Sequence, residues 1–481
     1  MGGKKNHPIH VNHDKNYFTP TFESQEVLTR KDKDNTIQLK DLKTTGEVAD
    51  YDPYLFRSVD HPTTNSETLL HLLKGSLGTG ILAMPLAFYH SGYLFGVIAT
   101  ALIGAICTYC IHLLIKAEYV LCKRRQLPSM TYPQTVQFAL MDGPPFLQKC
   151  APYSGAVVNT FLLTYQLGTC CVYTVFIADN VKQVGDEYIG EMDHRLYMLI
   201  FLLPLILINF IRNLKLLAPL MTIANIITIG GFGIILYYLV LENITLEGRD
   251  MVGKLEDMPL YFGTVLFALE AIGVIMPLEN EMKTPKSFGG SFGVLNISMF
   301  AIVLMYILMG LFGFLAYGAD TKASITLNVG QGYTELKDKI PADIAKLMLS
   351  LAIFFSHALQ MYVAIDITWT QWLSLKLQKS SMHNLYEYGV RAALVLITFC
   401  LAVAVPELDL FISLFGALCL SALGIAFPAI VDLSTHWDTL HGSRGIMIIC
   451  KNVFLIIFST FGLIVGTGTS LMKIIDKFFS H

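Results

Sequence analysis

Glycine and hydroxyl residues cluster in the middle of the first apolar segment of the chain. Gly75, Gly78 and Gly80 fall within six residues, and Ser76 and Thr79 stand between them. Each glycine costs about 1 kcal/mol inside a helix, and amides freed from a helix in lipid need polar partners. The spacing therefore predicts a helix broken near the bilayer midplane, whose free N–H groups and dipole can hold a carboxylate. Close helix packing through small residues is the alternative.

An acidic residue marks a second apolar segment in the later half of the chain. Glu270 stands in an otherwise uncharged run that includes Phe267, Ala268 and Gly273. A charge near the bilayer centre costs roughly 3 kcal/mol on insertion scales, so an intramembrane carboxylate is taken as functional by default. Because proton uptake removes that charge, Glu270 is a candidate proton carrier. A glutamate hydrogen-bonded permanently to a neighbouring helix is the alternative.

The composition indicates that such segments cross a membrane. Of the 481 residues, 53% are hydrophobic and 15% are charged, whereas soluble domains carry about 25% charged residues. Several runs reach the roughly 20 residues that a helix needs to cross the hydrocarbon core, and only helices or closed barrels satisfy their backbone in lipid. The prediction is an all-α polytopic membrane protein. Its net charge of −3 does not suggest nucleic acid as a partner.

Eleven spans are predicted after a polar N-terminal region. Residues 1–66 carry many charges of both signs and are expected to be a disordered cytoplasmic tail, which leaves 67–481 as the transmembrane domain. The spans are expected at about 68–90, 93–117, 153–180, 195–211, 214–241, 258–279, 290–318, 342–373, 387–405, 408–431 and 446–472. They form two groups of five, about 68–241 and 258–431, plus one extra helix. Since five is odd, the second group is inverted relative to the first, and a site is expected between them.

The orientation follows from the basic residues of the loops. Lys123, Arg124 and Arg125 are expected to face the cytoplasm, which places the N-terminus inside and the C-terminus outside or in a lumen. The sequon Asn243-Ile-Thr245 then lies outside and predicts a glycosylated loop. A second sequon at Asn296 falls within the seventh span, out of reach of glycosylation.

Three motifs resemble one transporter family, the proton-coupled amino acid transporters of the amino acid/auxin permease superfamily. They are His71-Leu-Leu-Lys-Gly75 with Gly78-Thr-Gly80 and Pro85 in the first span, Gln166-Leu-Gly168 with Cys170-Cys-Val-Tyr173 in the third, and Phe267-Ala-Leu-Glu270-Ala-Ile-Gly273 with Pro277-Leu-Glu-Asn280 in the sixth. The resemblance covers about 68–470. It implies an APC/LeuT-like fold of two inverted five-helix repeats with broken first and sixth helices.

The same resemblance implies a function. Members of the family use protons to drive small neutral amino acids across the plasma membrane or the late endosomal and lysosomal membrane. No cofactor beyond the coupling proton is expected, and the chain is not expected to be an enzyme. A transceptor, which binds amino acids and signals to a growth pathway through partners of its N-terminal tail, remains the alternative.

The resemblance also implies residue roles. Residues 75, 76 and 78–80 would hold the substrate carboxylate, and backbone carbonyls around Phe267, Ala268 and Glu270 would meet its ammonium group. His71 would take part in proton coupling, for which the imidazole pKa is suited; a histidine packed near the interface is the alternative. Tyr165 and Tyr173 are candidates to line the pathway, although aromatics at this spacing are equally typical of a core.

The eighth span departs from the family pattern. His357 stands where the family is expected to have tyrosine, and Asp366 stands where it is expected to have glutamate. Nine residues at about 100° each place the two side chains on opposite faces of a straight helix. At most one of them can face the pathway, and Asp366 is the preferred candidate because it keeps an intramembrane acid.

Overall fold

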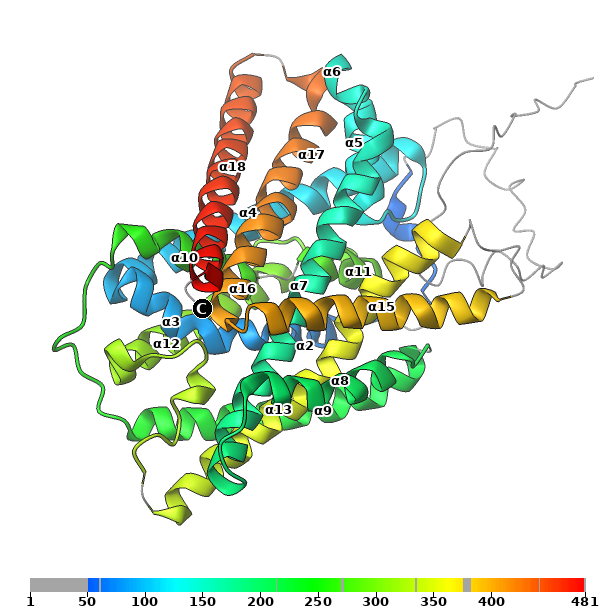
Figure 1. Cartoon of the computed structure of the whole chain (residues 1–481). Coiled ribbons are helices and arrows are strands. Elements are labelled where there is room, and N and C mark those ends of the chain that lie inside the picture. Colours follow the sequence, from blue (N-terminus) through cyan, green and yellow to red (C-terminus); the bar gives the residue numbers. More distant parts are fainter. Residues whose placement is uncertain are drawn as a thin grey trace, which may run out of the picture.

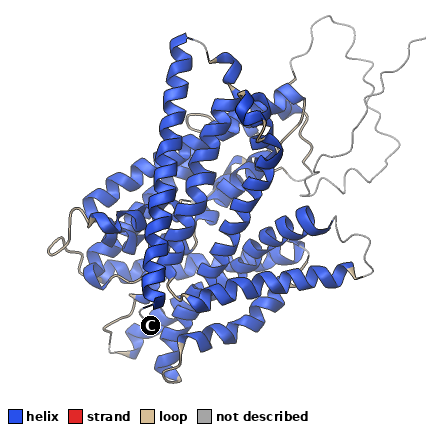
Figure 2. Cartoon of the chain, turned by 45° about the horizontal axis from the view of Figure 1, so that its top comes forward, coloured by secondary structure: helices blue, strands red, loops and turns tan. Residues whose placement is uncertain are grey.

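The computed structural model describes residues 51–59, 62–212, 214–269, 272–333, 335–374, 382–440 and 442–479. Nearly all secondary structure in these ranges is helical (Figure 2), apart from a β-bridge between Thr63 and Met282. Eight helices of the described residues are long and apolar enough to cross a membrane, and a bent pair adds a ninth span. The prediction of an all-helical, polytopic membrane protein is confirmed.

The first half of the bundle follows a short 3-10 turn, η1 (Pro53–Leu55). Its helices are α2 (Asn65–Ser76), α3 (Thr79–Ser91), α4 (Tyr93–Arg125), α5 (Tyr132–Asp142), α6 (Pro145–Gln148), α7 (Ala151–Tyr188), α8 (His194–Asn209) and α9 (Leu214–Leu241).

The second half also begins with two short helices, which longer ones follow. Its main elements are α10 (Met258–Ala268), α11 (Ile272–Asn280), α12 (Val294–Tyr317), α13 (Leu336–Ile365), the π-helical η6 (Asp366–Leu373), α15 (His383–Ala404), α16 (Leu408–Phe415), the π-helical η7 (Gly416–Ala426), α17 (Phe427–Thr435) and α18 (Gly442–Phe479). Short 3-10 turns in the loops are η2 (Leu255–Asp257), η3 (Pro285–Ser287), η4 (Gly318–Asp320), η5 (Ile325–Leu327) and η8 (Trp437–Thr439).

Each predicted span coincides with one of these helices or with a divided set of them. The first is divided between α2 and α3, the sixth between α10 and α11, and the tenth among α16, η7 and α17. Among the described residues, α8 is shorter than a full span and α10 and α11 are shorter still. The count of eleven spans and the inverted repeat therefore stay predictions.

The start of the first divided helix is set by a local sequence signal. Glu67 accepts a hydrogen bond from the Thr64 backbone N–H at 2.8 Å, and the Thr64 hydroxyl accepts one from the Glu67 N–H at 3.4 Å. This reciprocal pair is a capping box, which satisfies backbone donors that a helix start leaves free. The break between α2 and α3 has no such side-chain cap.

The helices form two packed groups (Figure 1). In one group α3 contacts α10 and α12, and α12 also contacts α2 and α4. In the other, α8, α9, α13 and α15 lie together, with α13 against α9 and α15 against α8. Helix α7 contacts both α13 and α16, and it also reaches α3. Residues from widely separated spans therefore meet around α7 and α3.

Helix α18 lies along the outside of the bundle, against η7 and α10. Phe454, Ile457, Phe461 and Ile464 are each more than 60% exposed. Their spacing of three and four residues places them on one face of the helix. A stripe of exposed large apolar side chains on a long helix is the surface that lipid covers. Helix α18 thus presents a lipid-facing side.

Candidate functional site

The first divided span has a backbone break at the predicted place. Helix α2 ends at Ser76, α3 begins at Thr79, and their axes differ by 54°. Leu77 leaves the helical region at φ −83° and ψ 74°, and Gly78 is extended, with no side chain capping α3. The first amides of α3 therefore lack an intrahelical partner. Together with the positive end of the helix dipole they form a site suited to a carboxylate.

In the sixth span the first helix, α10, ends at the matching position. Helix α10 ends at Ala268, the Leu269 N–H still bonds to the Val265 carbonyl at 2.9 Å, and α11 begins at Ile272. The candidate proton carrier Glu270 lies outside the described residues. Gly273, another predicted site residue, falls in the first turn of α11.

The two interruptions touch each other. A Cβ added to Gly80 would stand 2.6 Å from the Cα of Ala268, so the two backbones are in direct contact at this point. Thr79 and Gly80 are buried, and Phe267 and Ala268 are 5% and 4% exposed. The free amides of α3 therefore lie beside the end of α10, as a site shared by the first and sixth spans requires.

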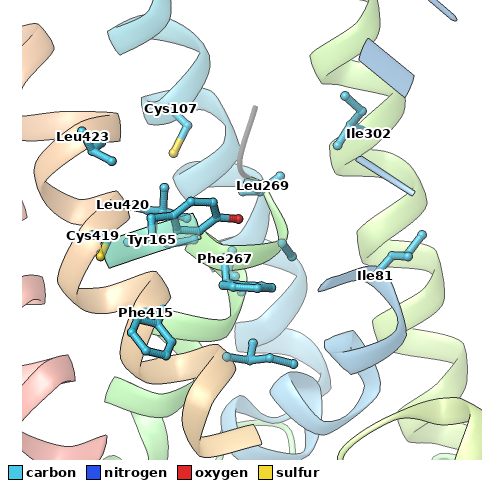
Figure 3. Close-up of a cluster of buried hydrophobic side chains, with 14 of the residues drawn as sticks. Ile81, Cys107, Tyr165, Phe267, Leu269, Ile302, Phe415, Cys419, Leu420 and Leu423 are labelled. Carbon is cyan, nitrogen blue, oxygen red and sulfur yellow. The ribbon is translucent and has the colours of Figure 1, made fainter. Parts of the chain in front are cut away.

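Helix α7 adds two tyrosines to this region. The hydroxyl of Tyr173 is 3.9 Å from the position that a Cβ on Gly78 would take, and it pairs with the side chain of Gln360 on α13. The rings of Tyr165 and Phe267 lie with their centroids 5.8 Å apart, and Figure 3 shows them side by side next to Leu420. Both predicted tyrosines are placed beside the breaks, Tyr173 with a polar group available and Tyr165 in an apolar cluster.

A further tyrosine completes the end of α2. Tyr306 on α12 is fully buried, and its hydroxyl donates a hydrogen bond of 2.5 Å to the Ser76 carbonyl. The same carbonyl also accepts a hydrogen bond from the Gly78 N–H at 3.1 Å, so two donors meet it at the end of α2. The sequence carries a signal that could have found it, since Tyr306 is the one hydroxyl in the apolar run 299–316. Gln360 was likewise not singled out by the sequence.

The remaining candidates of α2 face in different directions. Ser76 is buried, and its hydroxyl donates to the Leu72 carbonyl at 3.0 Å. His71 and Gly75 are exposed, and nothing lies within 4 Å of a Cβ added to Gly75. The buried residues of the predicted carboxylate site are therefore Ser76, Thr79 and Gly80, and Gly78 is half-buried.

The two titratable residues of the eighth span are placed elsewhere. His357 is fully buried and its Nδ1 lies 3.2 Å from the Asn209 side-chain nitrogen of α8. Asp366 lines a cavity of about 300 Å³ together with Arg212, Glu387 and Arg391. No residue of α2, α3, α10 or α11 lines that cavity, as far as the described residues show. Neither side chain joins the two helix breaks.

Comparison with known proteins agrees with this geometry. A family model described as "Transmembrane amino acid transporter protein" matches residues 61–472. A Drosophila melanogaster protein, "Proton-coupled amino acid transporter-like protein pathetic", is 39% identical over 434 residues, which is 90% of each chain. The Arabidopsis thaliana "Amino acid transporter AVT3A" is 27% identical over 86% of this chain and 91% of its own.

A solved structure of the transporter Mhp1 in an inward-facing conformation has the same fold. It superposes with a TM-score of 0.51 over 88% of this chain and 91% of its own, at 14% identity. At that identity the likeness concerns the fold alone, which is LeuT-like. With the family model matched over most of the chain and two long relatives, this chain is a member of the transmembrane amino acid transporter family.

Proposed function

We propose that the protein is a proton-coupled symporter of small neutral amino acids that works by alternating access. The substrate carboxylate binds the free amides at the start of α3, and the ammonium group faces the carbonyls at the end of α10. The bundle has eleven spans in two inverted repeats, with the N-terminus in the cytoplasm and Asn243 glycosylated on the other side. Residence at the plasma membrane or the late endosomal and lysosomal membrane belongs to the same proposal.

The observation that carries the proposal is the backbone contact between Gly80 and Ala268. It brings an uncapped helix start next to a helix end, so donors and acceptors of opposite partial charge lie within one small region. An amino acid zwitterion has complementary charges at about this separation. The buried Tyr165, Phe267 and Leu269 place bulky apolar side chains nearby, and this favours small substrates.

The proton carrier is proposed to be Glu270. It follows α10 directly, next to Leu269, and no other acidic residue stands in the interruption of the sixth span. His71, Asp366 and His357 are weaker candidates, because His71 is exposed on α2, His357 contacts Asn209 on α8 and Asp366 lines the cavity with Arg212, Glu387 and Arg391. The relative named as proton-coupled supports a proton as the coupling ion.

The test is uptake by purified protein in liposomes. Labelled alanine should accumulate when the outside is acidic relative to the inside, and a proton ionophore should abolish the accumulation. Competition with glycine, proline and bulkier amino acids then measures size preference. Equal uptake with and without the pH gradient would contradict proton coupling. Saturable alanine binding with negligible flux would instead favour the transceptor.

A further inference from the structure

Arg57, which precedes the first membrane helix, is buried between two glutamates. The Arg57 guanidinium donates to the Glu279 carboxylate on α11 at 2.9 Å and lies 3.7 Å from the Glu118 carboxylate on α4. The three side chains are 6%, 2% and 2% exposed. Arg57 also donates to the Glu279 and Pro128 carbonyls at 3.2 and 3.0 Å.

Residues 51–59 and 62–64, here called the strap, make further contacts with the same end of the bundle. Thr63 bridges Met282 through two backbone hydrogen bonds of 2.9 Å, one to the Glu281 carbonyl and one from the Lys283 N–H. Asp52 pairs with Lys286 at 2.8 Å. The hydrogen bond from Lys286 lowers the pKa of the Asp52 carboxyl, so this pair stays charged at neutral pH.

Aromatic contacts hold the strap to α4. The Arg57 guanidinium lies over the Tyr54 ring, 4.7 Å from its centroid, and the Tyr54 ring is 4.8 Å from that of Tyr119. The strap therefore joins α4, which belongs to the predicted first repeat, to the end of α11, which belongs to the second. Arg57 precedes residue 61, where the match to the family model begins.

A transporter with alternating access must open at each end in turn, by rocking or gating of one part of the bundle against another. At this end, release of the strap from α4 and α11 would take away the cation that the two carboxylates share. A buried charge that loses its partner is strongly unfavourable unless water reaches it. The cluster can therefore persist only while this end is closed.

We propose that the strap is the gate at this end of the pathway and that Arg57 is its positioning residue. The gate is closed when Arg57 lies between Glu118 and Glu279 and Thr63 bridges Met282, and it opens when the strap leaves α11. Transport requires this release in every cycle. The inference depends on amino acid transport itself and not on the nature of the coupling ion.

A reversible cross-link tests whether the strap must leave. The pair Thr63→Cys and Met282→Cys stands at bridged backbone positions, whose spacing of about 4.8 Å lies within the Cα range of a disulfide. The exposed Cys150, Cys400 and Cys450 are first replaced by serine. Oxidation of the double variant should lower alanine uptake at least about tenfold, a reductant should restore it, and each single variant should be unaffected by oxidant. Full uptake by the cross-linked protein would refute the gate.

Substitution of the arginine tests its role by a change in KM. Without Arg57 the closed state is less populated, so alanine offered from the opposite side should show a KM at least about threefold higher, because apparent affinity falls with the competent fraction. Arg57→Ala should show this rise and Arg57→Lys should reverse part of it. The control is Arg124→Ala. Arg124 lies at the end of α4 and forms a partly exposed ion pair with Asp142 at 3.1 Å, so the KM of this variant should not change.

A structural role alone would lower the amount of folded protein and leave KM unchanged, which would overturn the proposal. If the unsubstituted protein took up no alanine, the proposed substrate would be wrong. The gate would then be tested by the rate of cross-linking instead. The disulfide between positions 63 and 282 should then form at least about fivefold more slowly in Arg57→Ala than with Arg57 present. Equal rates would refute the gate in that case too.

Discussion

Gly80 on α3 and Ala268 on α10 meet backbone to backbone, so closely that a Cβ on Gly80 would lie 2.6 Å from the Ala268 Cα. The contact joins the two interrupted spans at the point where each leaves its helix. It sets the distance between the free amides of one and the terminal carbonyls of the other, and the substrate site proposed above depends on that distance.

Replacement of Gly80 by alanine should therefore impair transport. The added methyl group must push α3 away from the α10 backbone, and overpacking of this kind costs about 1–3 kcal/mol. We expect alanine uptake to fall roughly tenfold at equal amounts of folded protein, which corresponds to about 1.4 kcal/mol. Gly389→Ala on α15 is the matched control, because nothing lies within 4 Å of its added Cβ. Normal uptake by the Gly80 variant would show that the contact is not needed.

Tyr306→Phe should destabilise the break in the first span. The substitution removes one of the two donors to the Ser76 carbonyl and leaves the Gly78 N–H, and the loss of one such hydrogen bond costs about 1 kcal/mol. A thermal unfolding midpoint lower by about 2–4 °C in detergent is expected, together with reduced uptake. Tyr153→Phe, at a position 72% exposed, should change neither. Unchanged stability and uptake in Tyr306→Phe would remove Tyr306 from the site.

Glu270→Gln should remove the pH dependence of uptake. Glutamine has nearly the same shape but cannot carry the proton, so exchange of labelled for unlabelled alanine can continue while the pH gradient no longer drives accumulation. The measurement is accumulation and exchange in the same liposomes. Asp366→Asn serves as the comparison, and its gradient-driven accumulation should persist. If the two variants behaved in the opposite way, the proton would be assigned to the cavity lined by Asp366.

Asn243→Gln should abolish a glycan on the expressed protein. Asn243 is exposed in the loop after α9, where the predicted orientation places it outside. A gel shift on deglycosylation that is lost in this variant would support that orientation. Asn296→Gln should have no effect, because the Asn296 side chain is held by His112 at 2.7 Å and by the Gly290 and Ser291 carbonyls. A shift that depended on Asn296 would contradict the topology.

Stability should depend on pH through His436, which follows the last turn of α17. A hydrogen bond to the Asp432 carboxylate raises the pKa of His436. A group whose folded pKa is raised stabilises the fold fully below its unfolded pKa of about 6.5, and this contribution is lost as pH rises through the folded pKa. The pair is partly exposed, so the effect on Tm should be on the order of 1 °C between pH 6 and pH 8. His436→Gln should remove that difference, and a variant that kept it would exclude this pair as its origin.

The sequence predicted the elements of the site better than their partners. Glycine density and an intramembrane acid indicate breaks in the first and sixth spans because each signal is local, and the span limits follow from runs of apolar residues. Tyr306 and Gln360 are not predicted as site residues, because their partners, Ser76 and Tyr173, lie in other spans. Periodicity within one helix carries no information about such pairs.

The eighth span shows a different limit. The predicted angle between His357 and Asp366 assumes a straight α-helix, whereas the α-helix α13 changes to the π-helix η6 at Asp366 itself. A π turn closes i to i+5 hydrogen bonds, so a fixed angle per residue does not hold beyond that point. The sequence could not predict the partners of the two side chains, which are Asn209 on α8 for His357 and the charged residues of the cavity for Asp366.

Arg57 also decides where the chain can be shortened. Removal of residues 1–50 would leave every contact described above in place. Removal of residues 1–60 would keep every helix from α2 to α18, but it would remove Arg57 and leave Glu118 and Glu279 without their shared cation. Two truncations that differ by ten residues should thus differ sharply in behaviour, and the functional limit of the transporter lies before its first membrane helix.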